Sequence, residues 1–485
     1  MKGDFSRDTF DPAKHFTRVL MQQGRVMLDS DWNEQGSLLL HYLRSLAADL
    51  IGPHGGPQNV CGFKIMTAAD LNSSCAPETP ETEGADDLRG RTLARNFLIG
   101  SGRYYVGGLL CENPRVATYA TEARLPALAQ PDLAAGELAD GAYLVYLDAW
   151  EHHVTALEDE SIREVALGAQ GPDTATRARV AWQVRALRTA EFERVECGNI
   201  QESNQWKTLL ATLQPEHRGL LSAKADEPDD PDSFEPCTLS PDARFRGAEN
   251  QLYRVEIHRG GRVGDARPPT FKWSRENGSV MLPVSTVAGQ QVTLDRLGRD
   301  ARSGVQVGDW VEVFDEDLTR RDRPTPLLRV TEVNPVDMVV TLDGEPHDAP
   351  DAGERAEPMR NPLLRRWDQK EGDPRRGGLE LRDGAALVKE GRGDEGWLEL
   401  EDGIRIKFEP NGNYRAGDYW LIPARTATGD VEWPGEVGRP EPRPPHGVTH
   451  FYAPLARIEV GGGGVTVRAD YRRRFVPLAA CFPKK

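Results

Sequence analysis

The amino-acid sequence predicts a mainly β protein, made of several β-sandwich or barrel modules with one N-terminal α-helix. Two observations support this fold class. Glycine (48 residues) and proline (35) are spread along the chain, with short runs of alternating apolar and polar residues between them, as in β-rich domains with many turns. Only one long stretch combines helix start and stop signals with helical spacing. The 485 residues are enough for more than one hydrophobic core.

The predicted helix follows the stretch VLMQQGRVML. Asp29, Ser30 and Asp31 suit a helix start, because such side chains accept hydrogen bonds from free backbone N–H groups. Gly52-Pro53 marks the end of the helix. Between them, spacings of four and three residues alternate along Trp32, Gly36, Leu39, Leu43, Leu46 and Leu50. This spacing gives one apolar seam, which either packs on the chain's own sheet or joins another helix as in a coiled coil.

Strands are predicted for most of the chain after the helix. A first β domain spans residues 90–215, with hairpins at 96–113, a buried strand at 143–150 and an alternating strand at 177–187. An acidic, proline-rich linker follows at 216–245.

Two further β modules are predicted beyond the linker. Residues 246–346 carry short, closely spaced strands, which indicate a small barrel or sandwich. A second acidic, proline-rich stretch separates them from a C-terminal β domain at 375–485. That domain includes a hairpin turning at Asp402-Gly403, a residue pair that favours a type I′ turn.

Composition excludes several classes of function. The net charge of −16 disfavours nucleic acid and anionic membranes as partners. No apolar stretch is long enough to span a bilayer and none opens the chain, so we expect synthesis in the cytoplasm without a signal peptide. The six cysteines are scattered and form no CxxC pair, so neither a disulfide framework nor a zinc site is expected. No cofactor is predicted.

The usual catalytic motifs are missing, and one cluster of polar residues remains as a candidate metal site. It consists of Asp148, Glu151, His152, Glu158 and Asp159, with His153 beside it. Adjacent histidines on a strand point to opposite faces, so both cannot easily bind one ion. The interpretation that we favour is a solvated acidic loop after a buried strand.

Tryptophans give a second alternative. Six of the ten lie after residue 270, and exposed tryptophans can stack on sugars: Trp273, Trp310, Trp367, Trp397, Trp420 and Trp433. A glycan-binding or glycan-cleaving protein would expose several of them on one face, with carboxylates nearby. Most of them sit in alternating strands, which favours core packing. No glycan contacts can be assigned from the sequence.

The N-terminal stretch FSRDTFDPAKHFTRVLMQQGRVMLDSDWNEQ resembles the start of phage tail-fibre and baseplate-like proteins. The matching residues are Phe10, Asp11, Pro12, Gly24, Arg25, Asp31, Asn33 and Glu34. The chain as a whole resembles a bacterial family of unknown function that is associated with phage-derived contractile injection systems. The matching phrases are MKGDFSR, EDESIREVALG, TFKWSRENGSV and GDYWLIPARTATGDVEWP. Neither resemblance supplies catalytic residues.

These resemblances imply a non-enzymatic structural role as a fibre, baseplate or accessory subunit of a phage-tail-like or contractile injection particle. Residues 1–60 would be the attachment and oligomerisation segment, with Gly24, Arg25 and the helical seam as its contact residues and Asp31 or Glu34 as a partner for Arg25. The expected partners are copies of the chain, with a trimer favoured, and other tail or baseplate subunits. Release outside the cell, as part of the particle, would need lysis or a dedicated machine. A glycan-active β protein is the alternative.

Overall fold

The computed structural model shows a mainly β protein with two α-helices in its described part, which confirms the predicted fold class. None of these helices is long and apolar enough to cross a membrane. The structure describes residues 1–67, 69–70, 95–119, 138–168, 173–188, 200–214, 218–226, 244–315, 325–346, 359, 361–436, 438–462 and 464–476. The second proline-rich stretch, near 346–362, lies mostly outside these residues, as do four of the six cysteines. Cys61 and Cys111 are buried, and they form no disulfide with each other.

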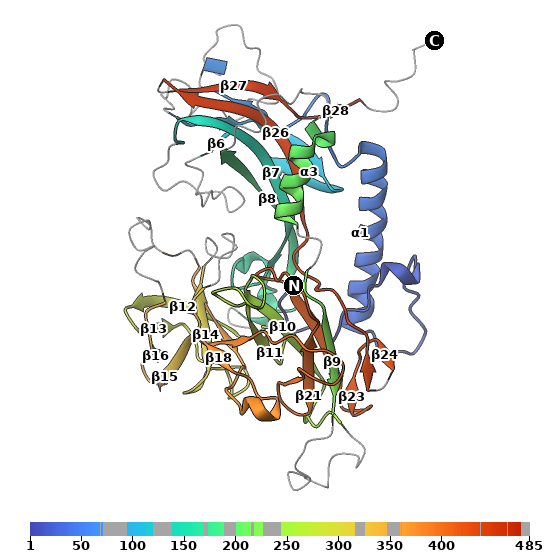
Figure 1. The fold of residues 1–485 in the computed structure, drawn as a ribbon, viewed down its shortest axis with the longest axis vertical. Coiled ribbons are helices and arrows are strands. Elements are labelled where there is room, and N and C mark those ends of the chain that lie inside the picture. Colours follow the sequence, from blue (N-terminus) through green and yellow to red (C-terminus); the bar gives the residue numbers. More distant parts are fainter. Residues whose placement is uncertain are drawn as a thin grey trace.

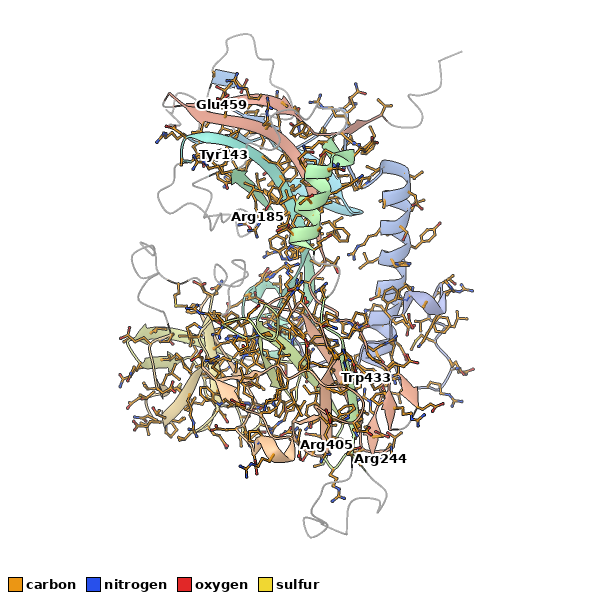
Figure 2. The ribbon with its side chains drawn as sticks, in the orientation of Figure 1. Tyr143, Arg185, Arg244, Arg405, Trp433 and Glu459 are labelled. Atoms are coloured by element: carbon orange, nitrogen blue, oxygen red, sulfur yellow. The ribbon has the colours of Figure 1, made fainter. Side chains whose placement is uncertain are left out.

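The β-strands gather into two bodies, which we call upper and lower after their places in Figure 1, and α1 (Asp29–Ile51) runs beside both. In Figure 2, Tyr143 and Glu459 mark the upper body, and Arg405 and Trp433 the lower one. Each body has a hydrophobic core of its own, and the barrel inside the lower body has a third.

The upper body contains two four-stranded sheets, a small sheet and the second helix, α3 (Asn204–Leu213). One sheet has the order β27 (Gly464–Asp470), β26 (His450–Gly461), β7 (Gly141–Val154) and β8 (Arg177–Arg188). The other has the order β28 (Arg474–Phe475), β1 (His54–Pro57), β4 (Gly102–Val106) and β5 (Leu109–Asn113). The small sheet joins β2 (Ile65–Met66), β3 (Leu98–Ile99) and β6 (Ala117–Thr118).

The lower body combines a six-stranded sheet with a closed six-stranded barrel. The sheet runs β18 (Leu381–Arg382), β19 (Ala385–Leu387), β11 (Thr270–Ser274), β10 (Gln251–Arg259), β22 (Tyr419–Arg425) and β23 (Asp430–Val431). The barrel runs β12 (Met281–Ala288), β13 (Gln291–Leu294), β16 (Val339–Leu342), β15 (Leu328–Asn334), β14 (Trp310–Phe314) and β17 (Leu363–Trp367). Two small sheets complete it: β20 (Leu398–Glu399), β21 (Ile404–Phe408) and β9 (Leu221–Ala225), and the pair β24 (Gly435–Glu436) and β25 (Arg439–Pro440).

Short 3-10 turns complete the described elements. They are η1 (Pro12–Lys14), η4 (Glu160–Ile162), η5 (Val165–Leu167), η6 (Ile200–Glu202) and η8 (Pro374–Arg376).

The local strand predictions agree with the structure. The hairpin of β4 and β5 turns at Gly107-Gly108, where both φ angles are positive (56° and 80°). Asp402 and Gly403 also have positive φ angles, 49° and 82°, between β20 and β21, as a type I′ turn requires. The predicted strands at 143–150 and 177–187 are longer in the structure, and they pair along their whole length as β7 and β8.

The predicted module boundaries differ from the observed ones. Strand β9 pairs with β21, and Phe245 is fully buried, so both ends of the predicted linker 216–245 belong to the lower body. Residues 227–243 of this linker lie outside the described part. The predicted C-terminal domain 375–485 is divided. Its first part joins β10 and β11, whereas β26 pairs with β7 of the upper body. The lower body is therefore inserted into the upper one.

Candidate functional site

Helix α1 is attached to the upper body through one face and one end. The Arg44 guanidinium lies 2.6 Å from a carboxylate oxygen of Glu151 on β7. The turn between β4 and β5 approaches the helix so closely that a Cβ atom at Gly108 would lie 2.6 Å from the Arg44 carbonyl oxygen. Leu38 is the only apolar side chain of α1 that is fully buried, with 6% exposure. The helix thus buries little of its own surface in the chain.

Residues at the start of the chain hold the other end of the helix. The Ser6 amide and hydroxyl donate hydrogen bonds of 2.9 and 2.6 Å to the Asp29 carboxylate. Burial alone would raise the pKa of Asp29, but these hydrogen bonds lower it. Thr9 donates to Glu34 at 2.6 Å. The helix begins at Asp29 and ends at Ile51 before Gly52, close to the predicted start and stop. The predicted capping is wrong, because Leu28 occupies the N-cap position and no side chain makes a capping hydrogen bond; Asp29 and Asp31 lie in the first turn instead.

The predicted seam faces solvent. The exposed fractions of its side chains are 73% for Trp32, 55% for Leu39, 49% for Leu43, 42% for Leu46 and 67% for Leu50, and Gly36 is exposed as well. Within the described chain, the seam therefore does not pack on the protein's own sheet, which was one of the two interpretations of its spacing.

Further apolar side chains extend this exposed surface. We define the assembly surface as the exposed apolar side chains of residues 16–50, which comprise the five seam side chains and Phe16, Leu20, Met21, Val26, Met27, Leu28, Leu40 and Tyr42. More than half of the exposed large apolar side chains in the described residues belong to it. Large contiguous apolar patches on soluble proteins usually mark interaction sites.

Gly24 and Arg25 lie in an exposed turn before the helix. Gly24 has φ = 70°, a left-handed conformation that favours glycine. In the described part of the chain, no ion pair joins Arg25 to Asp31 or Glu34, because the Glu34 carboxylate instead accepts a hydrogen bond from Thr9. The predicted Arg25 contact is thus not present within the single chain.

The candidate metal cluster is dispersed among other partners. Asp148 binds His450 (2.6 Å) and Arg185 (3.2 Å), and Glu151 binds Arg44. Glu158 accepts hydrogen bonds from the Thr155 amide (2.9 Å) and lies 3.3 Å from His152.

Asp159 and His153, the other two polar residues of this stretch, also have separate contacts. The Asp159 side chain caps the 3-10 turn Glu160–Ile162. His153 faces the ring of Phe5, on the opposite strand face from His152, as the alternation predicted. Among the described residues, no group of three His, Cys, Asp or Glu side chains is placed to hold a metal ion.

The six late tryptophans pack inward. Trp273, Trp367 and Trp420 are each 1% exposed, and the remaining three are half-buried. Trp397 lies beneath the ammonium groups of Lys224 and Lys407, at 4.5 and 5.1 Å from the ring centre. None of the six is fully exposed for stacking on a sugar, so no specific observation favours the glycan-binding alternative.

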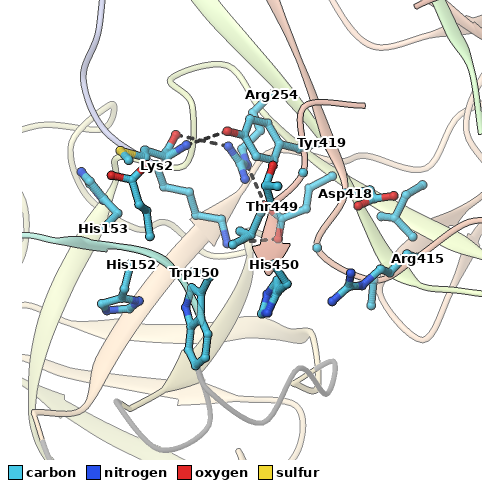
Figure 3. A pocket seen from close by; sticks show the side chains of 18 of the residues that line it. Lys2, Trp150, His152, His153, Arg254, Arg415, Asp418, Tyr419, Thr449 and His450 are labelled. Carbon is cyan, nitrogen blue, oxygen red and sulfur yellow. Dashed lines mark hydrogen bonds and ion pairs between the residues drawn. The ribbon is translucent and has the colours of Figure 1, made fainter. Parts of the chain in front are cut away.

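A cavity of about 470 Å³ lies between the two bodies, and we call it the junction cavity. Strands β7, β8 and β26 line it from the upper body, and β10, β11, β14 and β17 line it from the lower body. Figure 3 shows Trp150, His152, His450 and Arg415 along one side of it and Lys2, Arg254 and Tyr419 along the other. The Trp150 and His450 rings stack with their centres 5.0 Å apart.

Buried charges form the lower wall of the cavity. Glu256 lies 3.0 Å from Lys2 Nζ and 2.6 Å from Arg254 Nε, and Glu312 lies 2.5 Å from Lys272 Nζ and 3.3 Å from Arg365 Nη1. Burial alone would raise the pKa of Glu312, but the neighbouring cations, Lys272 foremost, lower it to about 2. Burial lowers the pKa of the Lys2 ammonium to about 7, although Glu256 opposes this shift.

Sequence reasoning did not find the cavity residues. Lys2, Glu256, Glu312 and Arg365 are far apart in the chain and share no motif. The one local signal was the presence of charged residues within apolar strands, as in YRVEIH and FKW, where Arg254, Glu256 and Lys272 are buried and line the cavity. Helix α3 was also missed, although Ser203 before it caps the helix through the Trp206 amide.

Comparison with known proteins gives one family match. The sequence profile of a family of unknown function (DUF6519) matches residues 1–199 and 196–471, almost the whole chain. No curated protein and no solved structure shows a significant match.

Proposed function

Starting from the finding that the chain belongs to the family of unknown function DUF6519, we propose that it is a non-enzymatic structural subunit of a phage-tail-like or contractile injection particle. Residues 16–50 join it to other copies of itself. The observation that carries this proposal is the assembly surface. It includes the leucine seam of a 23-residue helix, and exposed apolar surfaces of this kind usually mark sites of protein–protein contact.

The spacing of the seam supports a second copy of the chain as the occupant. Spacings of four and three residues are those of positions d and a in a heptad repeat, whose side chains insert between those of a like helix. The seam extends over roughly 30 Å at 1.5 Å per residue. Arg44 and Leu38 lie off the seam and attach the helix to its own body, so seam contacts between copies leave these attachments intact.

The width of the surface supports an assembly of more than two copies. Leu40 and Tyr42 flank the seam at heptad positions e and g, and they are 44% and 66% exposed. An apolar face of this width is typical of a helix in a bundle, whereas a two-stranded coiled coil needs only the narrow seam. We therefore propose a trimer about the helix.

The resemblance to tail-fibre and baseplate-like proteins supports the particle. Part of the resembling phrase lies against the helix, because Ser6 binds Asp29, Thr9 binds Glu34 and the Phe10 ring lies 5.7 Å from the His41 ring. Asp11 caps the turn Pro12–Lys14 that follows. This pre-ordered arm, together with the exposed seam, suits attachment to a particle. The compact β bodies then form the part that the arm attaches.

The first experiment measures the mass of the chain in solution by light scattering after size exclusion. Deleting residues 1–55 would remove Lys2 and Arg7, which bind Glu256 and Glu432 of the lower body, so substitution is the better perturbation. The test variant replaces Leu39, Leu43, Leu46 and Leu50 by Gln. The matched control replaces four exposed apolar residues elsewhere by Gln: Val165, Leu167, Val307 and Val336.

We expect wild type and control near three times 53.7 kDa and the seam variant near 53.7 kDa. A wild-type chain that stays monomeric at every concentration would refute self-assembly, as would a seam variant of wild-type mass. The particle role is tested separately, by asking whether the chain sediments with tail-like particles purified from its own cells. Its absence from them would contradict that role alone.

A further inference from the structure

The junction cavity has a positive lining inside an acidic protein. The net charge of the chain is −16, yet Lys and Arg residues on the lining outnumber Asp and Glu residues by seven to five. The excess lies in the lower wall, where two carboxylates, Glu256 and Glu312, are shared by four cations: Lys2, Arg254, Lys272 and Arg365. Asp418 is paired with Arg218, which does not line the cavity. A cavity of this kind attracts an anion, because a buried excess of positive charge is costly without a counterion.

His258 provides an independent sign of a ligand. It lies on the same face of β10 as Glu256, two residues along, and Lys272 is paired with Glu256 on the neighbouring strand. The residue is 6% exposed and lines the cavity, and its buried Nδ1 atom has no hydrogen-bond partner among the described residues. Buried polar atoms are nearly always hydrogen-bonded, so an unpaired one at a cavity wall indicates a missing partner.

The part of the cavity lined by the upper body carries two flat aromatic rings. Trp150 stacks on His450, and both line the cavity. Its volume of about 470 Å³ is within the range of small-molecule sites. We propose that the junction cavity binds a small organic anion, with its carboxylate or phosphate group beside His258 and Lys272 and its flat part near Trp150. Arg415 also lines the cavity, on the same side as His450 in Figure 3.

The experiment uses isothermal titration calorimetry on the full chain with three probes of similar size. Phenyl phosphate and benzoate carry the two candidate anionic groups on a flat ring, and benzyl alcohol is the neutral control. We expect one saturable site with a dissociation constant below about 1 mM for at least one anion, and no saturable binding of benzyl alcohol. Which anion binds more tightly distinguishes a phosphate from a carboxylate ligand.

Three variants locate the site. His258→Phe keeps a flat ring and removes its nitrogen atoms, and Arg415→Met removes a second positively charged group from the lining. Each variant is expected to weaken binding at least tenfold. Arg468→Met removes a surface arginine that pairs with Glu459 and does not line the cavity, and it should bind as wild type does. The proposal is overturned if neither anion binds wild type saturably, if benzyl alcohol binds equally well, or if both cavity variants keep wild-type affinity. If one variant does not fold, the other decides. None of these outcomes depends on self-assembly.

Discussion

Introducing one aspartate on the exposed face of α1, and separately on its buried face, tests whether the seam is a contact between copies of the chain or part of the chain's own core. Leu43 is 49% exposed on the seam, and Leu38 is 6% exposed against the upper body. Replacing each in turn by Asp introduces the same chemical change five residues apart in one helix. Leu43→Asp should abolish self-assembly and leave the single chain stable, whereas Leu38→Asp should destabilise the chain itself.

The magnitudes follow from these exposures. Burying a whole leucine side chain is worth about 1.5–3 kcal/mol, so burying the exposed half of Leu43 in an assembly contributes about 1 kcal/mol per chain. A carboxylate in the same contact costs several kcal/mol more to desolvate. Together they weaken association by about 4 kcal/mol per chain, roughly a thousandfold. Leu43→Asp should change the stability of the single chain by only about 0.5 kcal/mol, while Leu38→Asp should cost about 3 kcal/mol or more.

The assay pairs light scattering over a range of protein concentrations with thermal unfolding of each variant below its association range. We expect Leu43→Asp to be a monomer with nearly the wild-type monomer midpoint, and Leu38→Asp to unfold at a lower temperature. If Leu43→Asp kept the wild-type mass, the seam would not be the contact. If it destabilised the single chain as much as Leu38→Asp does, the seam would be part of the chain's own core.

Three further predictions concern the two bodies. Gly108→Ala should loosen α1, because its φ of 80° costs an L-residue about 1–2 kcal/mol and its Cβ would press on Arg44; faster proteolysis within the helix would show this, and an unchanged rate would contradict it. Arg472→Met should cost about 1–3 kcal/mol, because it leaves the buried carbonyl groups of residues 61 and 62 without the guanidinium that donates to them, whereas its other partner, Asp470, is partly exposed; hydrogen exchange should then rise in β1, and unchanged protection there would speak against it. Burial lowers the pKa of His258 to about 3, so only the unfolded chain takes up its proton below pH 6.5, and stability should fall with pH by about 1.4 kcal/mol per pH unit down to about pH 3. Urea unfolding at pH 6.5 and 5.5 should show this loss in wild type and less of it in His258→Phe, and equal losses would contradict the assignment.

Local features of the sequence predicted those elements whose cause is local. The acidic start and the glycine stop gave α1 within a few residues, and Gly107-Gly108 and Asp402-Gly403 gave their turns. The seam spacing also identified which side chains share a face of the helix. Whether that face would be buried could not be read from it, because the same spacing suits packing on a sheet and packing on another helix.

The junction cavity was not predicted for a similar reason, because its residues come together only in the folded chain. Lys2 meets Glu256, and Glu312 meets Arg365, only because strands of the sheet and the barrel bring them together. An ion pair between residues so distant in the chain leaves no periodic signal in either segment. Charged residues within otherwise apolar strands were visible, but their partners were not.

The sequence by itself determined the β class, the position of the one long helix and several of the turns, since these depend on backbone conformations that nearby residues favour or forbid. Only the tertiary structure decided that β26 returns to pair with β7 about 300 residues earlier in the chain. It also decided that the seam stays in solvent and that a positive cavity separates the two bodies. Strand partners and burial depend on which apolar faces complement one another across the whole fold, and that is a property of no single segment.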